Sequence, residues 1–143
     1  MKHLDLFAGI GGFSEGLTGI SQAVAACEIQ PTSRAIYRAN HPFVPIVDDI
    51  KAMKGDAFGP VDIVCAGFPC QPWSVGNRQR PGPKGLDDPR GALIWEMLRV
   101  IREASPKHVI MENVSGIKKF LPHLRTIFQS EGYRLRWVDW NLH

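Results

Sequence analysis

The stretch Val61-Asp62-Ile63-Val64-Cys65-Ala66-Gly67 is a short, nearly continuous apolar run. Such runs are typical of a central strand in a parallel sheet, because helices cover both faces of that kind of sheet. Outward from this run, strand-like and helix-like segments alternate along the chain. The alternation predicts an α/β fold, with a mostly parallel sheet and helices on both of its faces.

The expected strands lie near residues 3–7, 23–29, 43–47, 61–66, 108–112 and 133–140. One helix is expected to begin at Pro31, where the missing N–H of a first-turn proline costs nothing. A second begins near Ala92, and its apolar stripe consists of Leu93, Ile94, Met97, Leu98 and Ile101. A third carries a similar stripe made of Ile117, Phe120, Leu121, Leu124, Ile127 and Phe128. Trp137 and Trp140 are expected to pack on the sheet, whereas Trp95 lies off its stripe.

The composition is that of an ordinary globular domain, with 143 residues, 44% hydrophobic and 22% charged. The net charge of +3 permits a nucleic-acid partner without arguing for one. Three cysteines form neither a C-x-x-C pair nor a zinc-type Cys/His cluster, which predicts no metal and no disulfide. No apolar stretch is long enough to cross a bilayer, and no signal-peptide pattern is found, so we expect a reducing compartment and no membrane.

Cys70 stands directly after the apolar run, at the head of a segment over 69–91 that is rich in glycine, proline and arginine. In open α/β sheets, ligands collect in the crevice outside the carboxyl ends of the strands. A thiol placed there can meet a substrate. Cys27 and Cys65 fall within apolar strands and are expected to be small buried hydrophobes.

A glycine turn, Asp5-Leu6-Phe7-Ala8-Gly9-Ile10-Gly11-Gly12-Phe13-Ser14, follows the first strand and opens a helix. Such a turn brings backbone close beneath a nucleotide-like ligand, although it departs from G-x-G-x-x-G, and a plain strand-to-helix turn remains an alternative. Glu28 ends the second strand about 20 residues further on, where an acid can accept hydrogen bonds from both ribose hydroxyls. A solvated acid in a loop is the alternative for Glu28. Together the two features favour an adenosine-bearing ligand.

Glu112 lies in Met111-Glu112-Asn113-Val114, at the end of the expected strand over 108–112. If neighbours in sequence are neighbours in the sheet, this acid shares a rim with Cys70. A carboxyl group in a cleft can be kept protonated by desolvation and then act as a hydrogen-bond donor or acid. The alternative is an acid near a helix cap, since Asn113 or Ser115 could cap the next helix.

These segments together resemble the DNA (cytosine-5) methyltransferase family, in family order and with family spacing. The glycine turn is similar to the family's cofactor loop. Gly67-Phe68-Pro69-Cys70-Gln71-Pro72-Trp73-Ser74 is similar to its nucleophile segment, Glu112-Asn113-Val114 to its catalytic acid segment, and Asp87-Asp88-Pro89-Arg90-Gly91-Ala92-Leu93 to the end of its mobile loop. The resemblance implies a Rossmann-like methyltransferase fold, S-adenosylmethionine as the methyl donor, and a flipped cytosine in double-stranded DNA as the acceptor.

The resemblance also implies roles for individual residues. Cys70 would be the nucleophile and Glu112 the catalytic acid. The expected cofactor-binding residues are Phe7, Gly9, Gly11, Glu28, Asp49, Ile50, Pro69 and Leu93. Gln30 departs from the acid that the family often carries there, which implies at most a weaker cofactor site. A DNA-binding loop would use Gln71, Ser74, Arg78, Arg80, Lys84 and Arg90, with a solvated surface loop as the alternative.

The chain stops before the family's Gln-x-Arg-x-Arg segment, its target-recognition region and its carboxy-terminal strand and helix. We therefore expect residues 1–143 to be a partial catalytic domain, incomplete at its carboxy-terminal sheet edge, as a fragment, a truncated product or one subunit of a split enzyme. A complementing polypeptide would then carry target recognition. The implied location is cytoplasmic, in a bacterial, phage or archaeal setting, at the nucleoid when on DNA. Two alternatives remain: a noncatalytic cofactor-binding or regulatory module, and an RNA-methylating relative.

Overall fold

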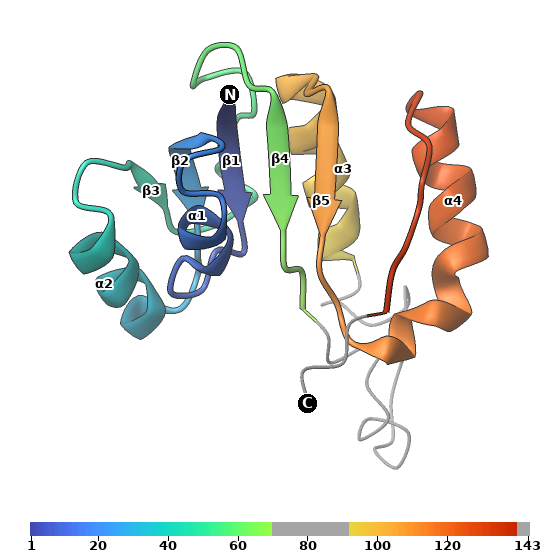
Figure 1. The fold of residues 1–143 in the computed structure, drawn as a ribbon, viewed down its shortest axis with the longest axis horizontal. Helices are drawn as coiled ribbons and strands as arrows, with labels where there is room; N and C mark the ends of the chain where they lie inside the picture. Colours follow the sequence, from blue (N-terminus) through green and yellow to red (C-terminus); the bar gives the residue numbers. More distant parts are fainter. Residues whose placement is uncertain (70–91, 140–143) are drawn as a thin grey trace.

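The computed structural model describes residues 1–69 and 92–139. In these ranges five parallel strands form one sheet in the order β3-β2-β1-β4-β5 (Figure 1). The parallel α/β fold predicted from the alternating segments is confirmed. The strands are β1 (Lys2–Leu6), β2 (Gln22–Cys27), β3 (Ile46–Val47), β4 (Ile63–Ala66) and β5 (His108–Met111).

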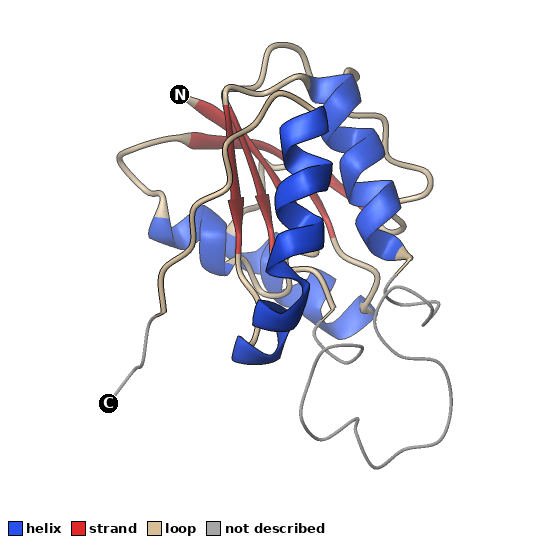
Figure 2. Ribbon diagram, turned by 90° about the vertical axis from the view of Figure 1, so that its right-hand side faces the viewer, coloured by secondary structure: helices blue, strands red, loops and turns tan. Residues whose placement is uncertain are grey.

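Helices cover both faces of the sheet (Figures 1 and 2). They are α1 (Gly12–Gly16), α2 (Pro31–Asn40), α3 (Leu93–Ala104), the 3₁₀ helix η3 (Ser115–Phe120) and α4 (Leu121–Ser130). The stripe predicted for the helix after Ala92 is confirmed, because its members are buried or half-buried in the main core with residues of α4. Trp95, off that stripe, is 46% exposed.

The side chains of β1 alternate between two layers. Leu4 and Leu6 are fully buried in the main core, which α3 and α4 complete. His3 and Asp5 are equally buried, and their hydrogen bonds run to Ser21 and Ser14 on the side of α1. The period-2 geometry of a strand therefore places apolar residues under α3 and polar residues under α1.

The chain direction across the sheet reverses at β1. From β1 the chain moves outward through β2 to β3, and it then returns to the other side of β1 as β4 and β5. This arrangement opens a crevice outside the carboxyl ends of the strands, at the switch point where ligands bind in open α/β sheets. The turn after β1 and the segment after β4 both enter that crevice.

The strand predicted over 133–140 is wrong for its described part, since residues 133–139 form neither strand nor helix. Tyr133 and Leu135 are half-buried and alternate with exposed residues, but a strand also needs a hydrogen-bonding partner. No strand pairs with β5 on this side among the described residues, and a cavity of about 310 Å³ is lined by residues 107–109 and 132–135. Trp137, which we expected on the sheet, is 54% exposed and lies beside the guanidinium of Arg125 instead. Trp140 lies outside the described residues.

The helix predicted over the stripe from Ile117 to Phe128 is divided in two. Residues 115–120 form the 3₁₀ helix, and α4 begins at Leu121 with Pro122 in its first turn. A proline cannot donate the hydrogen bond that a continuous α-helix would require at that point. Strand ends also differ from the predictions by a few residues; β3 begins only at Ile46, after Pro45, and Phe43 is 97% exposed.

Candidate active site

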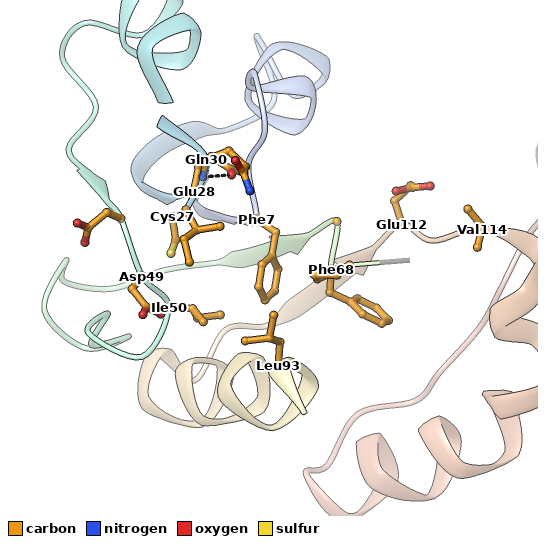
Figure 3. A pocket seen from close by; sticks show the side chains of 14 residues that line it. Phe7, Cys27, Glu28, Gln30, Asp49, Ile50, Phe68, Leu93, Glu112 and Val114 are labelled. Atoms are coloured by element: carbon orange, nitrogen blue, oxygen red, sulfur yellow. Dashed lines mark hydrogen bonds between the residues drawn. The ribbon is translucent and has the colours of Figure 1, made fainter. Parts of the chain in front are cut away.

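A pocket of about 490 Å³ lies at the carboxyl ends of the strands. A volume of this size is within the range of small-molecule and cofactor sites. Figure 3 shows the ring of Phe7 pointing toward Leu93, with Glu28 and Gln30 on one side of it and Glu112 and Val114 on the other. The pocket residues that we predicted from the sequence are Phe7, Glu28, Asp49, Ile50, Pro69, Leu93 and Glu112.

The glycine turn after β1 adopts left-handed backbone at three positions, Phe7 (φ 55°), Gly9 (φ 57°) and Gly11 (φ 103°). Positive φ is costly for a residue with a side chain, so the conformation of Phe7 stores strain where the chain enters the pocket. Gly11 is also needed for packing, because a Cβ there would lie 2.8 Å from His41 Nε2 and 3.2 Å from Tyr37. Neither Gly9 nor Gly11 lines the pocket directly.

Glu28 is the acid that joins this turn to β2. The amide of Gly9 donates to Glu28 Oε2 over 2.8 Å, and the amide of Gln30 donates to Oε1 over 2.7 Å. Arg34, in α2, donates to the backbone carbonyls of Glu28 and Ile29 over 3.0 and 2.9 Å. Glu28 is only 8% exposed, which excludes the alternative of a solvated loop acid. A carboxylate fixed in this way still has lone pairs free to accept hydrogen bonds from a ligand.

The opposite wall of the pocket comes from the loop after β3 and from α3. Asp49 and Ile50 lie on that loop, and Leu93 is the first residue of α3. Cys27 also lines the pocket, but burial, followed by the charge of Asp49, raises the pKa of its thiol to about 12. A thiol with such a pKa is a weak nucleophile, so Cys27 contributes surface and not chemistry.

Glu112 follows β5 and is tied to the end of β4. Its amide donates to Ala66 O over 3.1 Å, and the side-chain amide of Asn113 donates to Phe68 O over 3.0 Å. The expectation that β4 and β5 are neighbours is therefore confirmed. No side chain caps η3, so the alternative of a helix-capping Asn113 or Ser115 is wrong. Glu112 is exposed, and it lines the pocket.

The proposed nucleophile and DNA loop fall outside the described residues. These are Cys70, Gln71, Ser74, Arg78, Arg80, Lys84 and Arg90. The structure follows the nucleophile segment as far as Pro69, which lines the pocket. Within residues 1–69 and 92–139 no three His, Cys, Asp or Glu side chains gather as metal ligands, and no helix there has the length and apolarity to span a bilayer.

Sequence reasoning missed several residues of the site. Phe68, Val114, Ile29, Gly67 and Asp48 line the pocket, and Asn113 braces it. Most of them directly neighbour a predicted residue, and that adjacency is a signal the sequence offered. The hydrogen bond from Asn113 to Phe68 joins residues 45 positions apart and left no local signal.

The fold and the pocket define a parallel α/β protein with a pocket at the switch point of its sheet. The model of the C-5 cytosine-specific DNA methylase family matches residues 1–141, and the chain belongs to this family. The Type II methyltransferase M.HhaI of Haemophilus parahaemolyticus is 37% identical over 124 residues, covering 86% of this chain and 36% of that protein. The Type II methyltransferase M.AquIA of Picosynechococcus sp. is 39% identical over 127 residues, covering 81% of this chain and 49% of that protein.

Solved structures agree with this assignment. The crystal structure of S. pombe Dnmt2 methyltransferase has a TM-score of 0.69 and 26% identity, covering 91% of this chain and 42% of that one. A putative DNA modification methyltransferase from an E. coli prophage has a TM-score of 0.71 and 26% identity, covering 90% of this chain and 37% of that one. The chain spans from about a third to a half of the length of these relatives.

Proposed function

We propose that this chain is the catalytic part of an enzyme that methylates carbon-5 of cytosine in DNA, with S-adenosylmethionine as the donor. The observation that carries the proposal is a single pocket with a buried acid, Glu28, at one end and an exposed acid, Glu112, at the other. The first end suits an adenosine, and the second suits a base that enters from solvent. Cys70 directly follows Pro69, a residue of the same pocket.

The residues present fit S-adenosylmethionine, which when bound supplies an electrophilic methyl group. Glu28 would accept hydrogen bonds from the ribose hydroxyls, since two backbone amides already fix both of its oxygens. Phe7, Ile50 and Leu93 offer apolar surface for an adenine ring, and Asp49 lies beside them as a polar contact. Pockets of this kind combine apolar walls with a few placed polar groups.

Cys70 is the proposed nucleophile, and the other two cysteines support this by their burial. Cys65 is fully buried, and desolvation raises the pKa of its thiol to about 12, as it does for Cys27. The Cys70 thiolate would form a bond to carbon-6 of the cytosine, which makes carbon-5 nucleophilic. Carbon-5 would then accept the methyl group, and loss of its proton with expulsion of the Cys70 thiolate would restore the aromatic ring.

Glu112 would stabilise the charge that builds on the ring, by hydrogen bonding at N3 and the exocyclic amine. Glu112 is exposed in this structure, so a base that enters from solvent can reach it. The base reaches this end of the pocket only after it leaves the duplex stack, which costs a few kcal/mol. Contacts of the proposed loop residues Arg78, Arg80, Lys84 and Arg90 with phosphates would offset that cost.

We also propose that a complementing polypeptide supplies target recognition and a strand that pairs with β5. The amides of His108 and Glu112 donate to Asp62 and Ala66 on the β4 side. Alternation along a strand therefore turns the amides of Val109 and Met111 toward the other edge, beside the cavity of about 310 Å³. Among the described residues β5 is an edge strand, and such edges are usually covered in native proteins. Hydrogen exchange at Val109 and Met111 should slow when the partner binds.

Transfer of labelled methyl groups tests the function directly. The chain, together with its complementing polypeptide, is expected to label DNA, and Cys70→Ser is expected to abolish the labelling. Cys65→Ala is the matched control, because it removes a buried thiol and leaves the pocket intact. Cofactor binding without transfer to any acceptor would favour the noncatalytic module, and transfer to tRNA but not to DNA would favour the RNA-methylating relative.

A further inference from the structure

We propose that Arg99, in the middle of α3, is a positioning residue that fixes the pocket wall formed by Asp49 and Ile50, and through it the affinity for the cofactor. The inference rests on the proposed function, because it concerns the same pocket. Arg99 does not line the pocket itself. It would act through the backbone of the loop that follows β3.

The guanidinium of Arg99 joins this loop to α3 by charge-assisted hydrogen bonds. Its Nη2 donates to Ile50 O over 2.7 Å, and its Nη1 donates to Met53 O over 2.9 Å. On its own helix, Nε donates to Glu96 Oε2 over 2.9 Å and Nη1 to Glu103 Oε1 over 2.7 Å. One planar group thus binds two loop carbonyls and two carboxylates.

A second attachment lies at Gly55, a few residues further along the loop. The amide of Gly55 donates to Glu103 Oε2 over 2.7 Å. A Cβ at this position would lie 2.2 Å from Val100 O and 2.8 Å from Ala104 N, so the loop backbone approaches the helix backbone too closely for any side chain. Glu103 therefore receives both the loop amide and Arg99, and the loop is fastened at two points to the same face of α3.

The loop has little regular structure of its own. Between Asp49 and Met53 its backbone bonds are turn contacts, from Ala52 N to Asp49 O and from Met53 N to Ile50 O. Ile50 and Met53 point inward, with 4% and 1% exposure. Leu93 is the first residue of the helix that carries Arg99. The contacts of Arg99 therefore hold the loop residues Asp49 and Ile50 and the helix residue Leu93 together as one pocket wall.

Lysine is not an equivalent residue at this position. An ammonium is a point donor, whereas the guanidinium presents donors in a rigid fork that satisfies several acceptors at once. We expect Arg99→Lys to keep the charge facing Glu96 and Glu103 but to lose at least one of the two carbonyl bonds. Arg99→Gln should lose the charge and most of the contacts.

Arg102 provides a matched control on the same helix. It is exposed, and its guanidinium pairs with Glu131 beyond the end of α4, away from the pocket. In calorimetric titrations with S-adenosylmethionine, we expect the dissociation constant to rise about tenfold for Arg99→Gln and about threefold for Arg99→Lys. Arg102→Gln and Arg102→Lys should stay within about twofold of the wild-type value. The binding stoichiometry separates a loss of folded protein from a loss of affinity.

Amide hydrogen exchange gives a readout that does not depend on the ligand. Exchange over residues 49–55 should accelerate in both Arg99 variants and not in the Arg102 variants. If the wild-type chain binds S-adenosylmethionine and both Arg99 variants bind it equally well, Arg99 has no positioning role and the inference is wrong. If the wild-type chain does not bind the cofactor, the proposed function itself fails, and this inference fails with it.

Discussion

The amide of Gly9 donates a hydrogen bond to Glu28 Oε2 over 2.8 Å, which ties the turn after β1 to the residue after β2. The bond spans 19 residues of sequence and orders the acid before any ligand is present. Preorganisation of this kind lowers the cost of binding, because the acceptor oxygens need no rearrangement. The same bond makes the turn and the acid a single unit.

Replacing Glu28 with glutamine should therefore weaken cofactor binding without unfolding the chain. The new side-chain amide carries donors where Glu28 offers only acceptors, so it opposes the amide of Gly9 or of Gln30. We expect a loss of affinity of about 10- to 100-fold, which corresponds to one hydrogen bond to a charged group. Calorimetry measures it, and Glu15→Gln, which alters a side chain that is 63% exposed, is the control. Equal affinities for the two variants would refute the role of Glu28.

Gly11→Ala should destabilise the chain. Alanine at φ 103° is strained, and its Cβ would press on His41 Nε2 at 2.8 Å and on Tyr37. We expect the free energy of unfolding to fall by about 1–3 kcal/mol. At Gly16 a Cβ would meet nothing within 4 Å, so Gly16→Ala should be neutral or slightly stabilising. Urea unfolding compares the two variants, and a Gly11 variant as stable as the Gly16 variant would contradict the packing described here.

Asp5 should make stability depend on pH. It is fully buried beneath α1, its Oδ2 accepts from Ser14, and its Oδ1 has no hydrogen-bond partner within residues 1–69 and 92–139. Desolvation raises the pKa of Asp5 to about 6 from its ordinary value of 3.8. The pKa of Asp5 is higher in the folded state than in the unfolded state, so ionising Asp5 lowers the free energy of unfolding. This loss is absent below about pH 4, grows as the pH rises toward 6, and is constant above that.

The variant Asp5→Asn removes this titration. Relative to it, the wild-type chain should lose about 2–3 kcal/mol of unfolding free energy between pH 4 and pH 7. Urea unfolding of both proteins across that range gives the difference, in which the other titrating groups cancel. A difference that does not change with pH would show that Asp5 keeps an ordinary pKa in the fold.

Glu112→Gln should separate chemistry from cofactor binding. The side chain lies at the far end of the pocket from Glu28, and glutamine preserves its size while removing the acid. Loss of a general acid typically lowers a rate by about 10²- to 10⁴-fold. The rate of methyl transfer should fall by this factor, while the dissociation constant for S-adenosylmethionine stays within about twofold of the wild-type value. An unchanged rate, or an equal loss of both quantities, would argue against a role in catalysis.

Much of the fold could be predicted because its signals are local. The apolar run that became β4, the stripe of α3 and the glycine turn each lie within a dozen residues of sequence. The placement of Glu112 beside the end of β4 followed from one assumption about sheet order, and the ladder between β4 and β5 bears it out.

The sequence did not predict features that depend on a contact with a distant segment or on a strand partner. Residues 133–139 have the alternation of a strand, but no neighbouring strand among the described residues hydrogen-bonds to them. The contacts of Arg99 with Ile50 and Met53 span more than 45 residues and involve backbone carbonyls, which carry no sequence signal. Such contacts emerge only when the fold brings the segments together.

Trapping on DNA that contains 5-fluorocytosine tests the central claim most directly. Fluorine replaces the proton that must leave carbon-5, so a cysteine bonded to carbon-6 cannot be released after methyl transfer. With S-adenosylmethionine and the complementing polypeptide present, we predict a covalent protein–DNA adduct that maps to Cys70 and is absent in Cys70→Ser. An adduct that persists in Cys70→Ser, or methyl transfer to ordinary DNA by that variant, would contradict the assignment.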